Sequence, residues 1–179
     1  MTATIVDQRD IQRIGGVAAK FPSAYVVGEI LRDANAYSVL DVTYGKGRFY
    51  VVYRPKLLVG ADPKRWDWIV EPDEFYEVPV WWVGEVFNGE ADVVVCDPPQ
   101  WNMGVRYRRR GEYGYIVGTP ELIVRCAVEV ARGVDATYLL LHFNRLIDLP
   151  IERDVQMRWA ARYLYSEKPR VSHYTLYRV

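Results

Sequence analysis

The sequence predicts an α/β fold: a Rossmann-like, doubly wound and mostly parallel sheet that closes with an antiparallel C-terminal hairpin strand. Short runs rich in β-branched residues alternate with segments of helical period, which is typical of a parallel sheet covered on both faces. Three of the apolar runs end in an acid followed by a loop that contains glycine or proline. Near the end, two alternating runs are joined by Lys168-Pro169-Arg170, the pattern of a hairpin.

The first half of the chain supplies one predicted helix and two predicted strands. Ser23 follows a break at Phe21-Pro22, and we expect it to cap a helix that runs to about Arg32. The elements expected after it are a buried strand at Ser38–Val42, a tight loop at Gly45-Lys46-Gly47, a short helical or irregular piece over Arg48–Tyr53, and a second strand at Leu57–Ala61.

The second half continues the alternation. Tyr76–Val83 is expected to hold a third strand at an edge or a bulge, because Pro79 cannot donate to an inner ladder. Thr119 and Pro120 are a cap and a first residue for a helix that stops near Gly133. The remaining expected elements are strands at Ala91–Cys96 and Ala136–Phe143, a helix over Ile151–Ala161, and hairpin strands at Arg162–Glu167 and His173–Arg178.

Length and composition indicate a single domain over residues 1–179, with residues 1–20 as an N-terminal extension whose flexibility the sequence leaves open. The formal net charge is zero, so global charge argues neither for nor against a nucleic-acid partner. No signal pattern and no long apolar run is present, which favours a soluble cytoplasmic protein without membrane contact. Cys96 and Cys126 are expected as buried thiols, and no metal-ligand spacing occurs. The arginine-rich composition is compatible with a thermophilic source.

The first of the three acids opens the pattern D-x-x-x-G-x-G at Asp41 to Gly47. Glycines there let the backbone turn sharply and let a ligand lie against bare amides. Tyr50 stands where a dinucleotide fingerprint has its third glycine, so we expect a ligand without a pyrophosphate. A plain strand-to-helix turn is the alternative.

The other two acids follow later strands. Asp62 comes just after the second strand, where an acid can accept both hydrogen bonds of a ribose diol; a helix cap is the alternative. Asp97 precedes Pro98 and Pro99, whose fixed φ and missing N–H groups can hold exposed carbonyls toward a substrate; a structural turn is the alternative. His142 follows an apolar run and is expected as a strand-end residue rather than a ligand. Acids at three parallel strand ends together favour a site.

This trio resembles the class I S-adenosylmethionine-dependent methyltransferases, in particular the amino-methyltransferases of adenine N6, cytosine N4 and guanine N2 with their [D/N/S]-P-P-[aromatic] signature. The resemblance covers about Phe21 to the end of the chain. It implies S-adenosylmethionine as the cofactor, bound by Phe21, Pro22, Asp41, Thr43, Tyr44, Gly45, Gly47 and Asp62. It also implies a catalytic set of Asp97, Pro98, Pro99 and Trp101; Gln100 holds the usual aromatic place, and Trp101 follows it.

The segment after this motif suggests the substrate. Arg106, Tyr107, Arg108, Arg109 and Arg110 combine cations for phosphates with a ring for bases, and we assign them with Gln100 and Trp101 to substrate binding; a solvated loop is the alternative. We therefore expect methyl transfer to an exocyclic amino nitrogen of a DNA or RNA base. The alternatives are a catalytically silent module that binds nucleic acid or a partner, and an N-methyltransferase of small molecules or proteins. At this length, target recognition would need structured RNA or a partner subunit.

Overall fold

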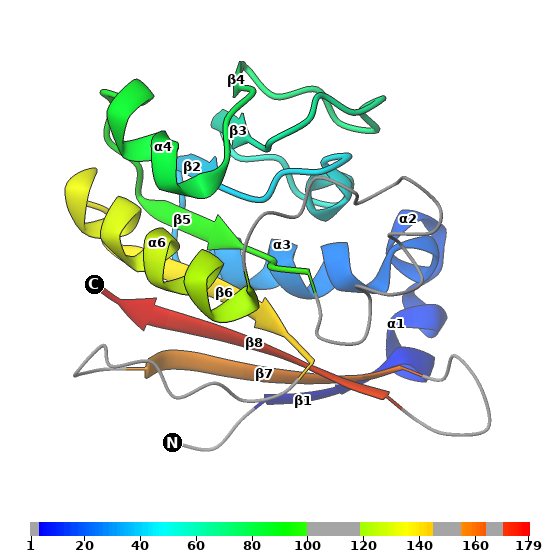
Figure 1. Cartoon of the computed structure of the whole chain (residues 1–179). Coiled ribbons are helices and arrows are strands. Elements are labelled where there is room, and N and C mark those ends of the chain that lie inside the picture. The colour runs from blue at the N-terminus through cyan, green and yellow to red at the C-terminus, as the bar shows by residue number, and fades with distance from the viewer. Residues whose placement is uncertain (1–3, 100–118, 145–154, 164–169) are drawn as a thin grey trace.

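The computed structural model describes residues 4–99, 119–144, 155–163 and 170–179. These residues form one eight-stranded sheet with helices on both faces (Figure 1). The strands are β1 (Thr4–Asp7), β2 (Ser38–Asp41), β3 (Leu57–Ala61), β4 (Glu74–Tyr76), β5 (Val93–Cys96), β6 (Tyr138–Phe143), β7 (Val155–Tyr163) and β8 (Arg170–Arg178). The helices are α1 (Gln8–Ile14), α2 (Gly16–Lys20), α3 (Pro22–Asp33), the 3-10 turn η1 (Arg48–Tyr50), α4 (Val80–Val86) and α6 (Pro120–Gly133).

The described sheet is parallel apart from one strand. Its order is β1-β7-β8-β6-β5-β2-β3-β4. The five strands from β4 to β6 in this order pair in parallel, and β1 pairs in parallel with β7. β8 runs antiparallel to both of its neighbours, β6 and β7. This topology confirms the Rossmann-like fold class with an antiparallel end.

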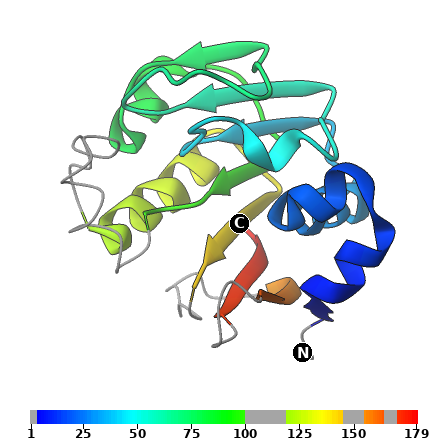
Figure 2. The ribbon, with the colours of Figure 1, turned by 90° about the vertical axis from the view of Figure 1, so that its right-hand side faces the viewer.

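The central strands are buried on both faces, so each one contributes to two hydrophobic cores. In β5, Val94 belongs to the same core as Val124 of α6, whereas Val95 belongs to the core that contains Ile30 of α3. Successive strand residues point to opposite faces, which is why a continuous apolar run suits this position. Figure 2 shows the result as three layers, with α4 and α6 on one side of the sheet and α1 to α3 on the other.

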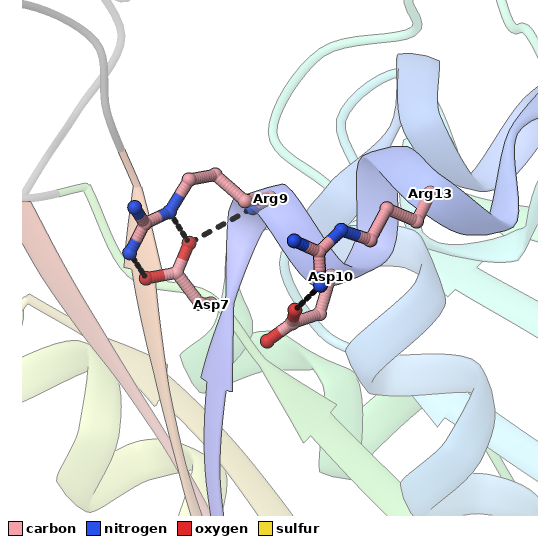
Figure 3. A network of polar contacts seen from close by, with 4 residues as sticks. All are labelled: Asp7, Arg9, Asp10 and Arg13. Atoms are coloured by element: carbon pink, nitrogen blue, oxygen red, sulfur yellow. Dashed lines mark hydrogen bonds and ion pairs between the residues drawn. The ribbon is translucent and has the colours of Figure 1, made fainter.

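The first twenty residues, set apart above as an extension, contribute β1, α1 and α2. Ile11 of α1 is fully buried. Asp7 ends β1 and caps α1, because its carboxylate accepts from the backbone N–H of Arg9 at 2.9 Å. The Arg9 guanidinium also binds both oxygens of Asp7, and these hydrogen bonds lower the pKa of Asp7 to about 2. Figure 3 shows this pair together with the Arg13–Asp10 pair on the same helix.

Several predicted elements are confirmed, and two are wrong. Leu57–Ala61 and the helix that Thr119 caps are as expected. The predicted helix over Ile151–Ala161 is instead, where the structure describes it, strand β7. Its alanines and arginines favour a helix, but pairing with β1 and β8 satisfies its backbone as a strand. Strands β7 and β8 pair antiparallel as the predicted hairpin requires, but the first strand runs over Val155–Tyr163, and residues 164–167 of the predicted strand lie outside the described residues.

The second error lies between β4 and α4. The predicted edge strand over Tyr76–Val83 contains only the last residue of β4, and Pro79 then serves as the N-cap of α4. The start of α3 also differs from expectation, because Phe21 is its N-cap and Ser23 lies inside the helix. Among the described residues, no helix is long and apolar enough to cross a membrane.

Candidate active site

Three strand ends meet at one edge of the sheet. β2 lies between β3 and β5, and all three run parallel, so their carboxyl ends face the same side. Asp41 is the last residue of β2, and Asp62 and Asp97 directly follow β3 and β5. The three acids singled out in the sequence therefore surround the loop that leaves β2, residues 42–47.

Asp41 is buried, with 2% of its surface exposed, and the protein engages both carboxyl oxygens. Oδ1 accepts from the backbone N–H of Thr43 at 2.9 Å and from its hydroxyl at 3.2 Å. Oδ2 accepts from the Tyr50 hydroxyl at 2.8 Å. Burial raises the pKa of Asp41 to about 7, although the hydrogen bonds from Thr43 and Tyr50 oppose that rise. Asp41 therefore holds the loop through Thr43. Tyr50, at the position where a dinucleotide fingerprint has its third glycine, donates its hydroxyl hydrogen bond to Asp41.

Thr43 connects the loop to the neighbouring strand end. Its hydroxyl donates to Asp41 Oδ1 and accepts from the backbone N–H of Asp97 at 2.7 Å. A hydroxyl can donate and accept at the same time, which neither glycine nor valine could do at this position. The backbone of Asp97 is thereby fixed relative to the loop.

The expectation of bare loop amides is wrong for four residues of the loop. Their backbone N–H groups all donate within the protein: Thr43 to Asp41, Tyr44 to the Ala61 carbonyl, Gly45 to Asp62, and Gly47 to the Tyr44 carbonyl. The loop thus holds its own shape with these amides instead of offering them to a ligand.

Tyr44 fills the space beneath the loop. Its ring is buried and stacks on Tyr50 with ring centroids 5.7 Å apart, and its hydroxyl donates to the Val70 carbonyl at 2.8 Å. A Cβ added to Gly60 would lie 2.7 Å from the Tyr44 ring, and one added to Gly47 would lie 2.7 Å from its hydroxyl. Tyr44 therefore requires Gly60, whereas Gly47 is required by the Val70 carbonyl, which lies nearest to the added Cβ, by Tyr44 and by its own φ of +68°.

Gly45 presents an open face of the loop beside Asp62. Within the described residues, a Cβ added to Gly45 would have one neighbour closer than 4 Å, the Thr43 carbonyl at 3.9 Å. Asp62 Oδ2 accepts from Gly45 N–H at 3.1 Å, and Oδ1 accepts from Lys64 N–H at 3.1 Å and Trp66 Nε1–H at 3.0 Å. A carboxylate has about four acceptor positions, so about one remains, where the sequence analysis expected room for two hydroxyls. Burial raises the pKa of Asp62.

Asp97 is held by its side chain as well as by its backbone. Its Oδ1 lies 2.8 Å from Nδ1 of His142, and about a third of its side chain, 35%, is exposed. His142 was expected as a strand-end residue, and its contact with Asp97 was not predicted. The contact follows from the strand register, because Cys96 of β5 pairs with Leu141 of β6 and so places Asp97 and His142 next to each other. The apolar runs of the sequence carry no signal for that register.

The other residues singled out in the sequence divide into two groups. Phe21 and Pro22 begin α3, and after Asp97 Pro98 is buried and Pro99 half-buried. Gln100, Trp101, Arg106, Tyr107, Arg108, Arg109 and Arg110 lie outside the described residues. In the part of the chain that is described, no three His, Cys, Asp or Glu side chains gather as a metal site would require.

Comparison with known proteins identifies the fold. The sequence matches no protein-family model and no curated protein. An rRNA methylase from Streptococcus thermophilus is 13% identical with a TM-score of 0.53, over 88% of this chain and 96% of that one. TrmN from Thermus thermophilus is 14% identical with a TM-score of 0.53, over 90% of this chain and 52% of that one.

A third similar structure is Pyrococcus abyssi tRNA (uracil-54, C5)-methyltransferase in complex with S-adenosyl-L-homocysteine. It is 15% identical with a TM-score of 0.54, over 87% of this chain and 38% of that one. The chain thus spans about half of TrmN and less of the Pyrococcus enzyme, but nearly all of the rRNA methylase. The chain shares the Rossmann-like fold of these methyltransferases.

Proposed function

We propose that the protein is an S-adenosylmethionine-dependent methyltransferase that acts on an exocyclic amino nitrogen of a nucleic-acid base, in DNA or RNA. The observation that carries the proposal is the position of Asp97. It follows a central strand, is held by Thr43 and His142, and lies at the same sheet edge as the open face of Gly45. Solved methylases of rRNA and tRNA with the same fold support the reaction class.

S-adenosylmethionine fits the cradle formed by Gly45 and Asp62. The open face at Gly45 is a space that a Cβ would enter, and the remaining acceptor position of Asp62 suits one ribose hydroxyl. Of the other residues that the resemblance assigns to the cofactor, those that set the shape of the loop are Asp41, Thr43, Tyr44 and Gly47. Phe21 and Pro22 act from the start of α3.

Bound S-adenosylmethionine supplies a methyl group on an activated sulfonium. The protein then has to align the amino nitrogen with the methyl–sulfur bond and make its lone pair available. The Asp97 carboxylate and the Pro98 carbonyl are acceptors for the two amino hydrogens. Together they favour a pyramidal nitrogen and stabilise the positive charge that develops on it. The base has to leave any stack to reach them.

The substrate assignment extends beyond the described residues. In this proposal Arg106 and Arg108 to Arg110 supply phosphate contacts, either Trp101 or Tyr107 stacks on the target base, and Gln100 belongs to the substrate-binding set. Charge-neutral replacement of the four arginines is expected to flatten the salt dependence of nucleic-acid binding. An unchanged slope would remove this segment from the interface.

A catalytically silent module is the second candidate, and two observations favour it. The loop amides are engaged internally, and Trp66 already donates to Asp62. Calorimetry with S-adenosylmethionine separates the two candidates, because the silent module predicts no heat at high micromolar ligand.

The reaction itself is tested by transfer of a tritiated methyl group. The substrates are total RNA, genomic DNA, and protein and small-molecule extracts, and label in the last two would redirect the proposal to another N-methyltransferase. Asp97→Ala is expected to abolish transfer and to leave the cofactor affinity within about threefold, because Asp97 contacts the acceptor and not the cofactor. Equal activity in that variant would refute the role of Asp97.

A further inference from the structure

Nδ1 of His142 lies 2.8 Å from Oδ1 of the Asp97 carboxylate. Its ring is fixed by two aromatic neighbours. It stacks on Tyr174 of β8 with ring centroids 4.4 Å apart and planes 18° apart, and it meets the edge of Phe49 of η1 at 5.6 Å. Two separate parts of the chain, β8 and η1, therefore hold the ring and determine the direction in which Nδ1 points.

The other ring nitrogen of His142 argues against a packing role. Nε2 is buried, and among the described residues it has no hydrogen-bond partner. A buried polar atom without a partner costs stability, so a phenylalanine between Tyr174 and Phe49 would fill this place at lower cost. The histidine is therefore explained by what Nδ1 does.

We propose that His142 is a positioning residue for methyl transfer: its Nδ1–H donates to Asp97 and fixes the plane of the carboxylate that receives the acceptor amine. This inference rests on the proposed function. A neutral imidazole carries one proton, so donation from Nδ1 leaves Nε2 as the bare nitrogen, in agreement with its lack of a donor partner. Thr43 fixes the backbone of Asp97, and His142 fixes the head group.

The chain allows the hydrogen bond and the ring to be removed separately. His142→Asn retains a donor near the position of Nδ1 and loses the ring, whereas His142→Phe retains the ring and loses the donor. We expect His142→Phe to lower kcat about tenfold to a hundredfold with cofactor affinity unchanged. Its Tm should stay the same or rise, because an unpaired buried nitrogen disappears. His142→Asn should keep more activity than His142→Phe despite a lower Tm.

A matched control is available because the chain has two histidines. His173 lies on β8, and His173→Gln should leave transfer unchanged. If His142→Phe transfers methyl groups at the wild-type rate, or if activity follows Tm across the variants, the positioning role is overturned.

A second measurement does not require activity. With two imidazoles in the chain, the 15N spectrum of labelled protein assigns the tautomer of each one. We expect the Nδ1–H tautomer at His142 in the wild type, and a shift towards Nε2–H in Asp97→Asn, whose amide can donate to Nδ1. The Nε2–H tautomer in a protein that transfers methyl groups would overturn this inference alone. Absence of cofactor binding and transfer in the wild type would overturn the proposed function.

Discussion

The buried carboxyl of Asp41 leads to a specific dependence of stability on pH. Burial raises its pKa to about 7 in the folded protein, from an ordinary value of 3.8. Below pH 3.8 the carboxyl is protonated in both the folded and the unfolded chain. Between 3.8 and 7 the unfolded chain releases this proton and the folded protein keeps it, so the free energy of unfolding falls as the pH rises.

The size of this effect follows from the two pKa values. A difference of about three pH units corresponds to about 4 kcal/mol, all of it lost by pH 7. Asp41→Asn removes the titration and nearly preserves the shape, because the amide oxygen can still accept from Thr43 and the Tyr50 hydroxyl can rotate to accept from the amide nitrogen. Between pH 4 and pH 7, the free energy of unfolding of this variant should therefore rise by about 4 kcal/mol relative to that of the wild type.

The assay is urea unfolding followed by tryptophan fluorescence at pH 4 to 8 for both proteins. Other titrating groups cancel in the difference between the two curves. Asp73→Asn is a control of opposite sign, because the Arg54 guanidinium lowers the pKa of Asp73, so that stability from this group is lost only as the pH falls. Parallel curves for the wild type and Asp41→Asn from pH 4 to pH 7 would refute the reasoning.

Three further predictions use single side chains of the site. Gly60→Ala should lower the free energy of unfolding by about 1–3 kcal/mol, since its Cβ would lie 2.7 Å from the Tyr44 ring. The control Gly84→Ala, at an exposed position of helix α4, should be neutral or should raise the free energy of unfolding by up to about 1 kcal/mol. Equal Tm shifts for the two variants would contradict this prediction. Thr43→Val, which removes the hydroxyl between two strand-end acids, should lower kcat more than tenfold at similar size; a wild-type rate in steady-state assays would show that the bridge is dispensable. Asp62→Ala should weaken cofactor binding at least tenfold by calorimetry, and an unchanged Kd would remove this acid from the site.

Local signals predicted those parts of the fold that local interactions determine. The helix α6 could be placed from Thr119, Pro120 and Gly133, because caps and breakers act through neighbouring residues. Strand β7 could not, because its helix-favouring residues become a strand only when β8 and the distant strand β1 pair with it. The stretch around Pro79 was ambiguous for a related reason, since its branched and aromatic residues suit a strand or a buried helix equally.

The site shows the same division. Parallel strands that end in acids were enough to predict that Asp41, Asp62 and Asp97 gather at one edge. The sequence could not show which of these carboxylates already accept hydrogen bonds from other groups of the protein. Burial and the Tyr50 hydroxyl engage Asp41 completely, and an indole donates to Asp62. The contact of His142 with Asp97 depends on the register between two strands 45 residues apart, which apolar runs alone do not fix.

The placement of β8 inside the sheet has a consequence for the order of assembly. Residues 4–7 are synthesised before the other described strands, yet their partners are residues 159–162, which in turn depend on residues 170–177 to reach β6. We expect the nascent chain to form the half of the sheet from β4 to β6 first, while residues 4–7 remain unpaired until β7 and β8 have formed. Strand β1 is thus synthesised before the other described strands and is among the last of them to dock.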